Sequence, residues 1–304
     1  MNRRDRVINQ NKVAPLSDIT RLIKDGDTVA IGGAWLSSHP MAIIRQIIRS
    51  GIKHLYALTI LGSVDIDILV GAGCLDRLMF SFVSMEAYGL PPNFRRAIEK
   101  EGLKYDEITG LAIILGFEAA GRGVPFLPYR GPFGSDCVKE RPEFYKTIKC
   151  PFTGEEMIAV PAIKPDVAII HAQRADPAGN TQIEGTGGSD LELAKAADKV
   201  IVSVEEIVPT DVIRQNPYKT KIPRFYVDMV IEAPFGAHPT SSIPSYVGDP
   251  WHMMKYMEMA ASPESFKDYL SEYVMGSEAE YLEKIGGPKH LDVLRKLARE
   301  VKLL

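Results

Sequence analysis

A glycine-rich stretch at residues 25–40 combines the residue types that bind an anion through the main chain. It reads Asp-Gly-Asp-Thr-Val-Ala-Ile-Gly-Gly-Ala-Trp-Leu-Ser-Ser-His-Pro, so an acidic turn leads into a short apolar run and then a Gly-Gly pair. Paired glycines after a strand allow positive φ and close approach of a ligand, and the amides that follow lie near a helix N-terminus. The N–H groups around Gly32, Gly33 and Ala34 therefore suit a phosphate, a carboxylate or an oxyanion. A strand-to-helix turn without any ligand explains these residues equally well.

Two adjacent carboxylates follow another apolar run. The segment Val202-Ser-Val-Glu-Glu206 places Glu205 and Glu206 just past a probable strand, and ligands of open α/β sheets bind at the carboxyl ends of strands. Neighbours on an extended chain point in opposite directions, so we expect at most one of the two to face a site. A carboxylate that starts a helix and interacts favourably with its dipole is an equally good interpretation.

Two further polar residues are candidates for a site. Glu86 follows an apparent strand, where it serves either catalysis or the cap of the next helix. His238 lies in a loop rich in Pro and Gly, where a histidine is more often a hydrogen-bonding residue than an acid or base. The chain has no strong nucleophile signature: it lacks the GxSxG elbow, the Walker loop, a GxGxxG that opens a nucleotide fold and the HExxH motif.

Composition argues against several classes of protein. The 304 residues carry 36 Lys and Arg against 39 Asp and Glu, a net charge of −3 spread along the chain, so we expect no nucleic-acid partner. Cys74, Cys137 and Cys150 lack metal-ligand spacing, so we expect neither a metal site nor a disulfide framework, which favours a cytoplasmic protein. No apolar run approaches the length of a membrane span, so no membrane partner is expected.

Alternation of short apolar runs with amphipathic segments predicts an open, mostly parallel, doubly wound α/β sheet. Strands are expected at 28–31, 55–61, 77–82, 111–115, 167–171, 199–204 and 229–233. Helices are expected at 41–50, 66–71, 93–100, 117–122 and 191–197. We interpret 1–304 as a single domain that contains a loop-rich excursion at 123–165, with a small antiparallel sheet, and a helical tail at 250–304.

Several motifs in the same order resemble the α subunit of class I coenzyme A transferases, most closely the glutaconate CoA-transferase group. The similarity covers nearly the whole chain through Asp25-Gly26, Gly32-Gly33, Pro40, Pro125-Phe-Leu-Pro128, Val160-Pro161, the segment from Asp166 to Gln173, Glu205-Glu206-Ile207 and 233–239. The resemblance implies a fold similar to that of ribose-phosphate isomerases. The family usually has Phe after the glycine pair and Gly two positions before the proline, where this chain has Ala34 and Ser38.

The resemblance also implies one half of an enzyme. In this family the thioester is attacked by a glutamate of the β subunit, so no catalytic side chain is expected in this chain and the partner is that β subunit, in an α2β2 or α4β4 assembly. CoA is a co-substrate, no cofactor is tightly bound, and the acceptor is a carboxylic acid, dicarboxylic acids included. The amides of Gly32, Gly33 and Ala34 are expected to support the oxyanion. The expected substrate-binding residues are Ser37, Ser38, Ser63, Ser84, Glu86 and His238.

Two other functions share this fold. A CoA-thioester hydrolase or ring-opening C–C hydrolase is suggested by a resemblance through Phe82-Val-Ser84 and Gly134-Ser-Asp136, although the acidic residue of those relatives aligns with Gly110 here. Glu86 is the residue that such a reaction would recruit instead. A non-catalytic sensor of acyl-CoA or sugar phosphate is the third interpretation, but no helix-turn-helix segment with a basic face accompanies it. The residues leave the acyl group and the CoA donor open.

Overall fold

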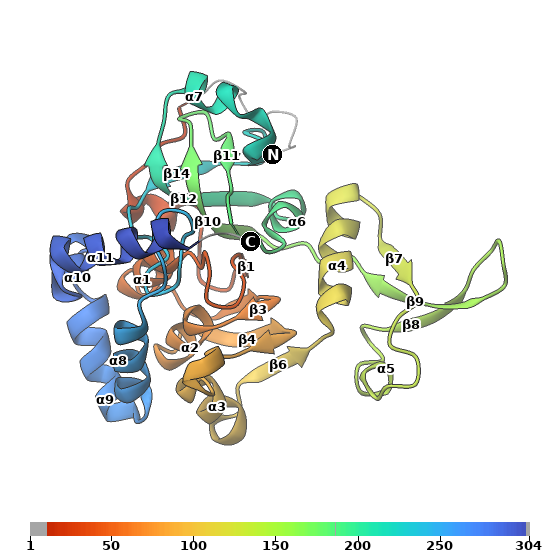
Figure 1. The fold of residues 1–304 in the computed structure, drawn as a ribbon. Helices are drawn as coiled ribbons and strands as arrows, with labels where there is room; N and C mark the ends of the chain where they lie inside the picture. Colours follow the sequence, from red (N-terminus) through yellow and green to blue (C-terminus); the bar gives the residue numbers. More distant parts are fainter. Residues whose placement is uncertain (1–10, 186, 302–304) are drawn as a thin grey trace.

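The core of the molecule is a nine-stranded, mostly parallel β-sheet, in a computed structural model that describes residues 11–185 and 187–301. Parallel strands follow the order β6-β4-β2-β1-β10-β12-β14, and β11 and β13 add antiparallel pairs beside β10 (Figure 1). The strands are β6 (Lys104–Glu107), β4 (Leu75–Phe80), β2 (Leu55–Leu58), β1 (Thr28–Ile31), β10 (Val167–Ala175), β12 (Lys199–Ile207), β14 (Met229–Glu232), β11 (Thr181–Gln182) and β13 (Thr220–Ile222).

Helices cover both faces of this sheet, because its central strands are apolar on both sides. Val29 and Ile31 of β1 pack into one core, whereas Ala30 packs into the other. The first core also holds residues of α1 (Met41–Arg49), α2 (Val64–Gly71), α8 (Pro250–Ala260), α9 (Pro263–Tyr269) and α10 (Glu278–Lys284). The second holds residues of α4 (Gly110–Arg122) and α6 (Asp190–Ala196). The predicted doubly wound α/β fold is confirmed.

Strand β1 lies at the point where the direction of winding reverses. From β1 the chain adds β2, β4 and β6 on one side, and then returns to add β10, β12 and β14 on the other. Ligands of open α/β sheets bind outside the carboxyl ends of the strands at such a switch point. The glycine pair Gly32-Gly33 immediately follows β1, so it lies at this position.

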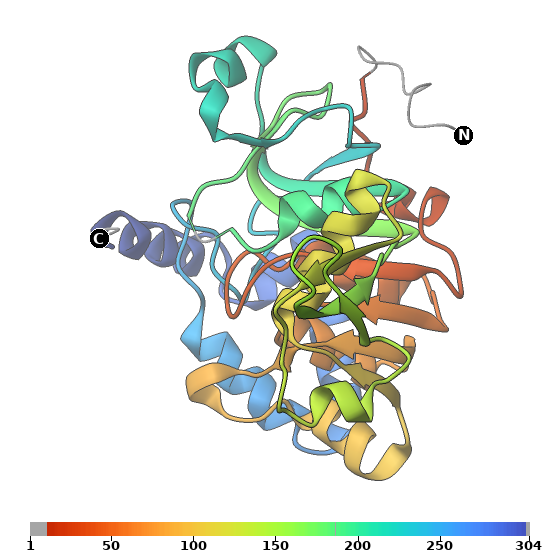
Figure 2. The ribbon, with the colours of Figure 1, turned by 90° about the vertical axis from the view of Figure 1, so that its right-hand side faces the viewer.

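Residues between α4 and β10 form a separate small sheet. Its three antiparallel strands are β7 (Phe126–Tyr129), β9 (Glu156–Pro161) and β8 (Lys146–Lys149), in that order, with the short helix α5 (Cys137–Glu140) between β7 and β8. This sheet projects from the rest of the molecule, as both ribbon views show (Figures 1 and 2). The antiparallel sheet expected in the excursion at 123–165 is present.

Two local predictions differ from the structure. Residues 111–115, expected to be a strand, belong to the helix α4, which runs on through 117–122. A short apolar run fits a buried helix as well as a strand, and here the continuous helix wins. Strand β6 was not expected, because most of its side chains are exposed at the edge of the sheet. The described elements also include the small pieces β3 (Leu61–Gly62), β5 (Phe82–Val83), α3 (Pro92–Arg96) and α7 (Thr210–Gln215).

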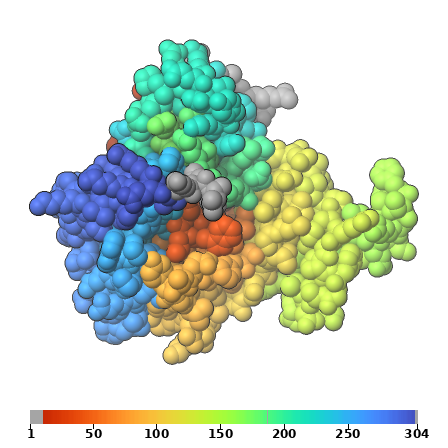
Figure 3. Space-filling model, viewed as in Figure 1, coloured from red at the N-terminus to blue at the C-terminus, as the bar shows by residue number. Residues whose placement is uncertain are grey.

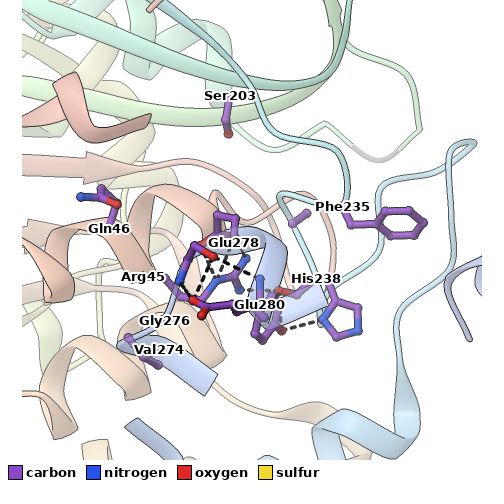
Figure 4. A network of polar contacts seen from close by, with 12 residues as sticks. Arg45, Gln46, Ser203, Phe235, His238, Val274, Gly276, Glu278 and Glu280 are labelled. Carbon is purple, nitrogen blue, oxygen red and sulfur yellow. Dashed lines mark hydrogen bonds and ion pairs between the residues drawn. The ribbon is translucent and has the colours of Figure 1, made fainter. Parts of the chain in front are cut away.

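A polar network ties the C-terminal helices, α8 to α11 (Gly287–Glu300), to the first helix. Arg45 of α1 is buried and donates through Nε and Nη2 to the carboxylate of Glu278, at the start of α10 (Figure 4). Its Nη1 donates to the carbonyl of His238, and its guanidinium lies 3.8 Å from the centre of the Tyr281 ring. None of the helices in the described part of the chain is long and apolar enough to cross a membrane.

Candidate functional site at the switch point

Glycine is required at both positions of the pair that follows β1. Gly33 has a φ of 94°, and a Cβ there would lie 2.9 Å from the backbone nitrogen of His39. A Cβ on Gly32 would collide with Oδ1 of Asp190. The pair therefore lets the main chain pass directly against two buried polar side chains.

A tight turn forms the tip of the loop at residues 32–39. Ala34 and Ser37 exchange two backbone hydrogen bonds of 2.9 Å each, which leaves Trp35 and Leu36 at the tip. Trp35 is 49% exposed and has a φ of 53°, in a position where two-residue turns with positive φ prefer glycine. The N-terminal colours that include this segment reach the surface at the centre of the face in Figure 3. The tip thus presents main chain outside the end of β1.

The segment after His238 holds the loop from behind. The backbone N–H of Ser38 donates to the carbonyl of Ser241 over 2.7 Å, and the N–H of Ser241 donates to the carbonyl of Leu36 over 2.9 Å. These bonds place residues from opposite ends of the chain at one site. They fix the loop on the side that faces the protein.

The three amides expected to support an oxyanion already have acceptors within the chain. Gly32 donates to the carbonyl of Ile169 and Ala34 to that of Ser37, both over 2.9 Å. The Gly33 amide donates to Oδ1 of Asp190 over 3.1 Å. In this conformation none of the three N–H groups is a free donor, so support of an oxyanion by this loop requires another of its amides.

Two buried acidic groups and a histidine lie beneath the loop. Nε2 of His39 is 2.7 Å from the carbonyl oxygen of Trp35, and Nδ1 is 3.0 Å from Oδ2 of Asp65. Burial opposes the charged form of His39, but the charge of Asp65 and these contacts raise its pKa above the usual value. Burial raises the pKa of Asp190 to about 6, and its Oδ2 has no hydrogen-bond partner among the described residues.

A second polar group joins three neighbouring segments at the same edge of the sheet. His171 of β10 contacts Oγ of Ser203 through Nδ1 at 2.9 Å and Oε1 of Glu205 through Nε2 at 2.7 Å. The other oxygen of Glu205 accepts the backbone N–H of Phe235 over 2.8 Å. Glu206 instead contacts Arg174 at the surface. As expected, only one of the two adjacent carboxylates points inward.

The predicted substrate-binding residues divide into two groups. Ser37 and Ser84 are half-buried and Glu86 is exposed; the Oγ of Ser84 accepts the backbone N–H of Glu86. Ser38, Ser63 and His238 are buried.

Two of the buried residues have partners that give them a structural place. The ring of His238 contacts the Tyr281 hydroxyl at 2.6 Å and Oδ2 of Asp249 at 3.0 Å. Ser63 lies at the start of α2, where its N–H donates to Asp65. The expectation that His238 and Ser63 contact substrate is therefore corrected: both side chains are enclosed by protein.

Sequence reasoning missed the polar groups beneath the loop. His39 stands inside the glycine-rich motif, immediately before Pro40, yet only its distance from Asp65 and the Trp35 carbonyl gives it a role. Asp190 is separated from Gly33 by 157 residues, and no motif links them. A signal was available only for His39, as a histidine within a motif that already pointed to a site.

Ser38→Gly should stabilise the protein slightly. Ser38 has a φ of 57°, in the left-handed region that costs an L-residue about 1–2 kcal/mol and glycine nothing. Because glycine also loses more backbone entropy on folding, we expect a net gain of about 0.5 kcal/mol or more in the free energy of unfolding. Urea denaturation of both proteins measures it. A loss of stability beyond about 1 kcal/mol would show that the buried hydroxyl matters more than the backbone.

Asp190→Asn should change how stability depends on pH. A carboxyl whose pKa rises from 3.8 to about 6 on folding stabilises the fold fully below its unfolded pKa, and this contribution is lost as pH rises through about 6. Relative to the Asn variant, the wild type should lose about 3 kcal/mol of unfolding free energy between pH 4 and pH 7. Denaturant titrations across this range test the sign, with Asp211→Asn as a control because that side chain is 83% exposed. A difference that stays flat or grows with pH would contradict the prediction.

A large cavity lies at the same edge of the sheet, beyond the end of β6. Its volume is about 630 Å³, and it lies where β6, the start of α4 and the helix α5 meet. Gly110 and three carboxylates, Glu107, Asp136 and Glu140, are among its lining residues. Glu86 does not line it. The position at which the hydrolase-like relatives are expected to carry an acid thus faces a cavity with other acids nearby.

Comparison with known proteins extends over nearly the whole chain. The family model described as coenzyme A transferase matches residues 16–233. The A subunit of glutaconate CoA-transferase from Acidaminococcus fermentans is 32% identical over 302 residues, which are 93% of this chain and 94% of that protein. The crystal structure of glutaconate coenzyme A-transferase from that organism matches with a TM-score of 0.88, at 32% identity, over 93% of this chain and 95% of that one.

Two other relatives are of a different kind. An uncharacterised protein of Archaeoglobus fulgidus is 42% identical over 287 residues; the match covers 92% of this chain and 63% of that relative, which is therefore considerably longer. A cholesterol ring-cleaving hydrolase subunit of Rhodococcus jostii is 32% identical over 285 residues, 90% of this chain and 96% of the relative. From the family match and the shared fold, the chain belongs to the coenzyme A transferase family and is similar to the first of the two subunits of its glutaconate CoA-transferase members.

Proposed function

We propose that this chain is the α subunit of a CoA-transferase that moves CoA between an acyl-CoA and a carboxylic or dicarboxylic acid. The observation that carries the proposal is the loop at 32–39, which presents main chain at the switch point of a fold shared with glutaconate CoA-transferase. The side chains packed against this loop, His39, Asp65 and Asp190, are buried. They suit the support of a reaction better than nucleophilic attack, so the nucleophile is assigned to a partner.

The proposed reaction uses a glutamate of a β subunit. Its carboxylate attacks the thioester carbonyl, and the tetrahedral oxyanion collapses to an acyl-glutamyl anhydride and CoA thiolate. The thiolate attacks the glutamyl carbonyl, which releases the first carboxylate and leaves glutamyl-CoA. The acceptor carboxylate attacks that thioester and expels the thiolate, which then attacks the acyl carbonyl of the new anhydride. The products are a new acyl-CoA and the free glutamate.

This chain contributes hydrogen-bond donors and polar contacts to that sequence. Every addition passes through an oxyanion, so backbone N–H groups at the loop are proposed to stabilise it. Ser37, Ser84 and Glu86 are the predicted binding residues that reach the surface, and we propose that they contact the acyl group. CoA acts as co-substrate without a tightly bound cofactor, in a cytoplasmic α2β2 or α4β4 assembly.

The test is a search for the covalent intermediate. The chain is co-purified with a candidate β subunit, incubated with acyl-CoA and examined by mass spectrometry of the intact subunits. A CoA adduct on a β-subunit glutamate, discharged by added carboxylate, supports the transferase. Light scattering of the complex gives the stoichiometry. Activity of this chain alone would contradict the half-enzyme proposal.

A hydrolase is the second candidate, favoured by the cavity beside Gly110 and by the similarity to the ring-cleaving hydrolase subunit. The same incubation separates the two functions. A hydrolase would release products in the absence of any acceptor carboxylate, and no CoA adduct would accumulate on either subunit.

A further inference from the structure

The peptide bond between Trp35 and Leu36 is held in one orientation by a buried histidine. A carbonyl oxygen only accepts hydrogen bonds, so Nε2 of His39, 2.7 Å from the Trp35 oxygen, must carry the proton of that contact. The described part of the chain has cis peptides only before Pro239 and Pro244, so this peptide is trans. In a trans peptide the C=O and the N–H point in opposite directions. The Leu36 N–H therefore points away from the buried ring.

The Leu36 amide has no acceptor among the described residues, unlike most of its neighbours in the loop. The amides of Ala34, Ser37 and Ser38 all donate to carbonyl groups of the chain. Leu36 stands at the tip of the turn, next to the half-exposed Trp35. Its N–H is therefore a donor directed outward from the loop at the switch point.

Asp65 prevents the histidine from turning. It lies 3.0 Å from Nδ1 of His39, and its other oxygen accepts the N–H of Ser63 over 2.7 Å. Both side chains are completely enclosed, with no exposed surface, so neither group can exchange its partner for bulk water. The chain Ser63, Asp65, His39, Trp35 carbonyl thus runs from the start of α2 to the tip of the loop.

We propose that His39, fixed by Asp65, is a positioning residue that turns the Leu36 N–H outward as a hydrogen-bond donor to the oxyanion of the reacting thioester. The inference rests on the proposed CoA-transferase function and assigns the donor within its loop. It accounts for a histidine and a carboxylate buried beneath a surface turn, and for the occupied amides of Gly32, Gly33 and Ala34.

The test compares three variants in the complex with the β subunit. His39→Phe keeps a ring of similar size without a donor, and His39→Gln keeps an N–H donor that reaches the Trp35 carbonyl. His54→Phe is the control, because that side chain is 68% exposed. The measured quantities are the single-turnover rate of adduct formation, the KM for acyl-CoA and the melting temperature.

His39→Phe should slow adduct formation about 100- to 1,000-fold with little change in KM, as expected for loss of one oxyanion donor. His39→Gln should recover most of the rate, and His54→Phe should match the wild type. A folded His39→Phe complex that forms the adduct at the wild-type rate would overturn the inference while leaving the transferase intact. A wild-type complex that forms no adduct would overturn the proposed function itself, and this inference with it.

A second variant removes the donor without touching the histidine. Replacing Leu36 by its α-hydroxy analogue, through nonsense suppression, converts the amide into an ester and deletes only the N–H. We expect the same loss of adduct rate, about 100- to 1,000-fold, at an unchanged KM. Normal adduct formation in this variant would exclude the Leu36 amide as the donor.

Discussion

Replacing Gly33 with alanine should slow turnover of the assembled enzyme about 100-fold, while the same replacement at Gly26 should leave turnover nearly unchanged. Both glycines have positive φ, 94° and 82°, so alanine costs similar backbone energy, about 1–2 kcal/mol, at either position. Their surroundings differ. A Cβ at Gly33 meets backbone atoms of His39 at 2.9 and 3.0 Å, whereas a Cβ at Gly26 meets nothing within 4 Å.

The two variants therefore separate backbone strain from displacement of the loop. Backbone atoms cannot rotate aside, so a methyl group at Gly33 must push the loop and His39 apart. A misplacement of about 1 Å near the chemistry costs roughly two orders of magnitude in rate. The kcat of each complex, together with its melting temperature, measures the effect. Equal rates for Gly33→Ala and Gly26→Ala would mean that the close approach to His39 has no part in catalysis.

Sequence patterns predicted the central strands well, because burial on both faces leaves a continuous apolar run. Residues 28–31 coincide with β1, and 167–171 lie within β10. The prediction failed at 111–115, where Leu-Ala-Ile-Ile-Leu sits inside a helix that starts at Gly110 and ends before Gly123. Only the packing of Ala112, Ile113 and Phe117 against the sheet identifies that run as helical.

The candidate site was predictable as a place but not as a network. The glycine pair marks the loop from local sequence alone, since its positive φ and close contacts demand glycine. The partners that give the loop its shape come from elsewhere in the chain: Asp65, Asp190 and Ser241. Their distances in sequence exceed the reach of any motif, so the sequence pointed to the wrong donors.

His238 illustrates the same limit from the opposite direction. A histidine between Gly and Pro residues resembles a site residue when only its neighbours are known. In the fold it is enclosed by Tyr281 of α10 and Asp249. The helical tail buries it, and nothing in the local sequence of the loop indicates where that tail packs.

Replacing Glu278 with glutamine should destabilise the protein by about 3–5 kcal/mol. Arg45 is 2% exposed and Glu278 24%, so the substitution leaves a buried guanidinium opposite a neutral amide. Arg49, which also contacts Glu278, adds a second positive charge 2.8 Å from the carboxylate. Both cations belong to α1, and their shared anion begins α10 (Figure 4). Loss of that anion should therefore loosen the C-terminal helices from the body of the protein.

A matched control is available on the surface. Glu99 pairs with Arg95 at 2.8 Å, but these side chains are 49% and 58% exposed. Glu99→Gln should cost well under about 1 kcal/mol, since solvent screens the pair. Urea denaturation of both variants gives the two free energies of unfolding, and limited proteolysis reports whether the helices after residue 277 open first. Similar losses from the two substitutions would show that the buried contact is no stronger than a surface pair.

The pH dependence of the Glu278 effect distinguishes charge from packing. Burial opposes ionisation of Glu278, but Arg45 and Arg49 lower its pKa below the ordinary value of 4.5. A carboxyl whose pKa falls on folding stabilises the native state above its unfolded pKa, and this contribution is lost as pH falls through the folded pKa. The advantage of the wild type over Glu278→Gln should therefore shrink on acidification below about pH 4.5. A difference that is the same at about pH 7 and about pH 3 would assign the effect to the shape of the side chain, because glutamine preserves that shape but lacks the charge.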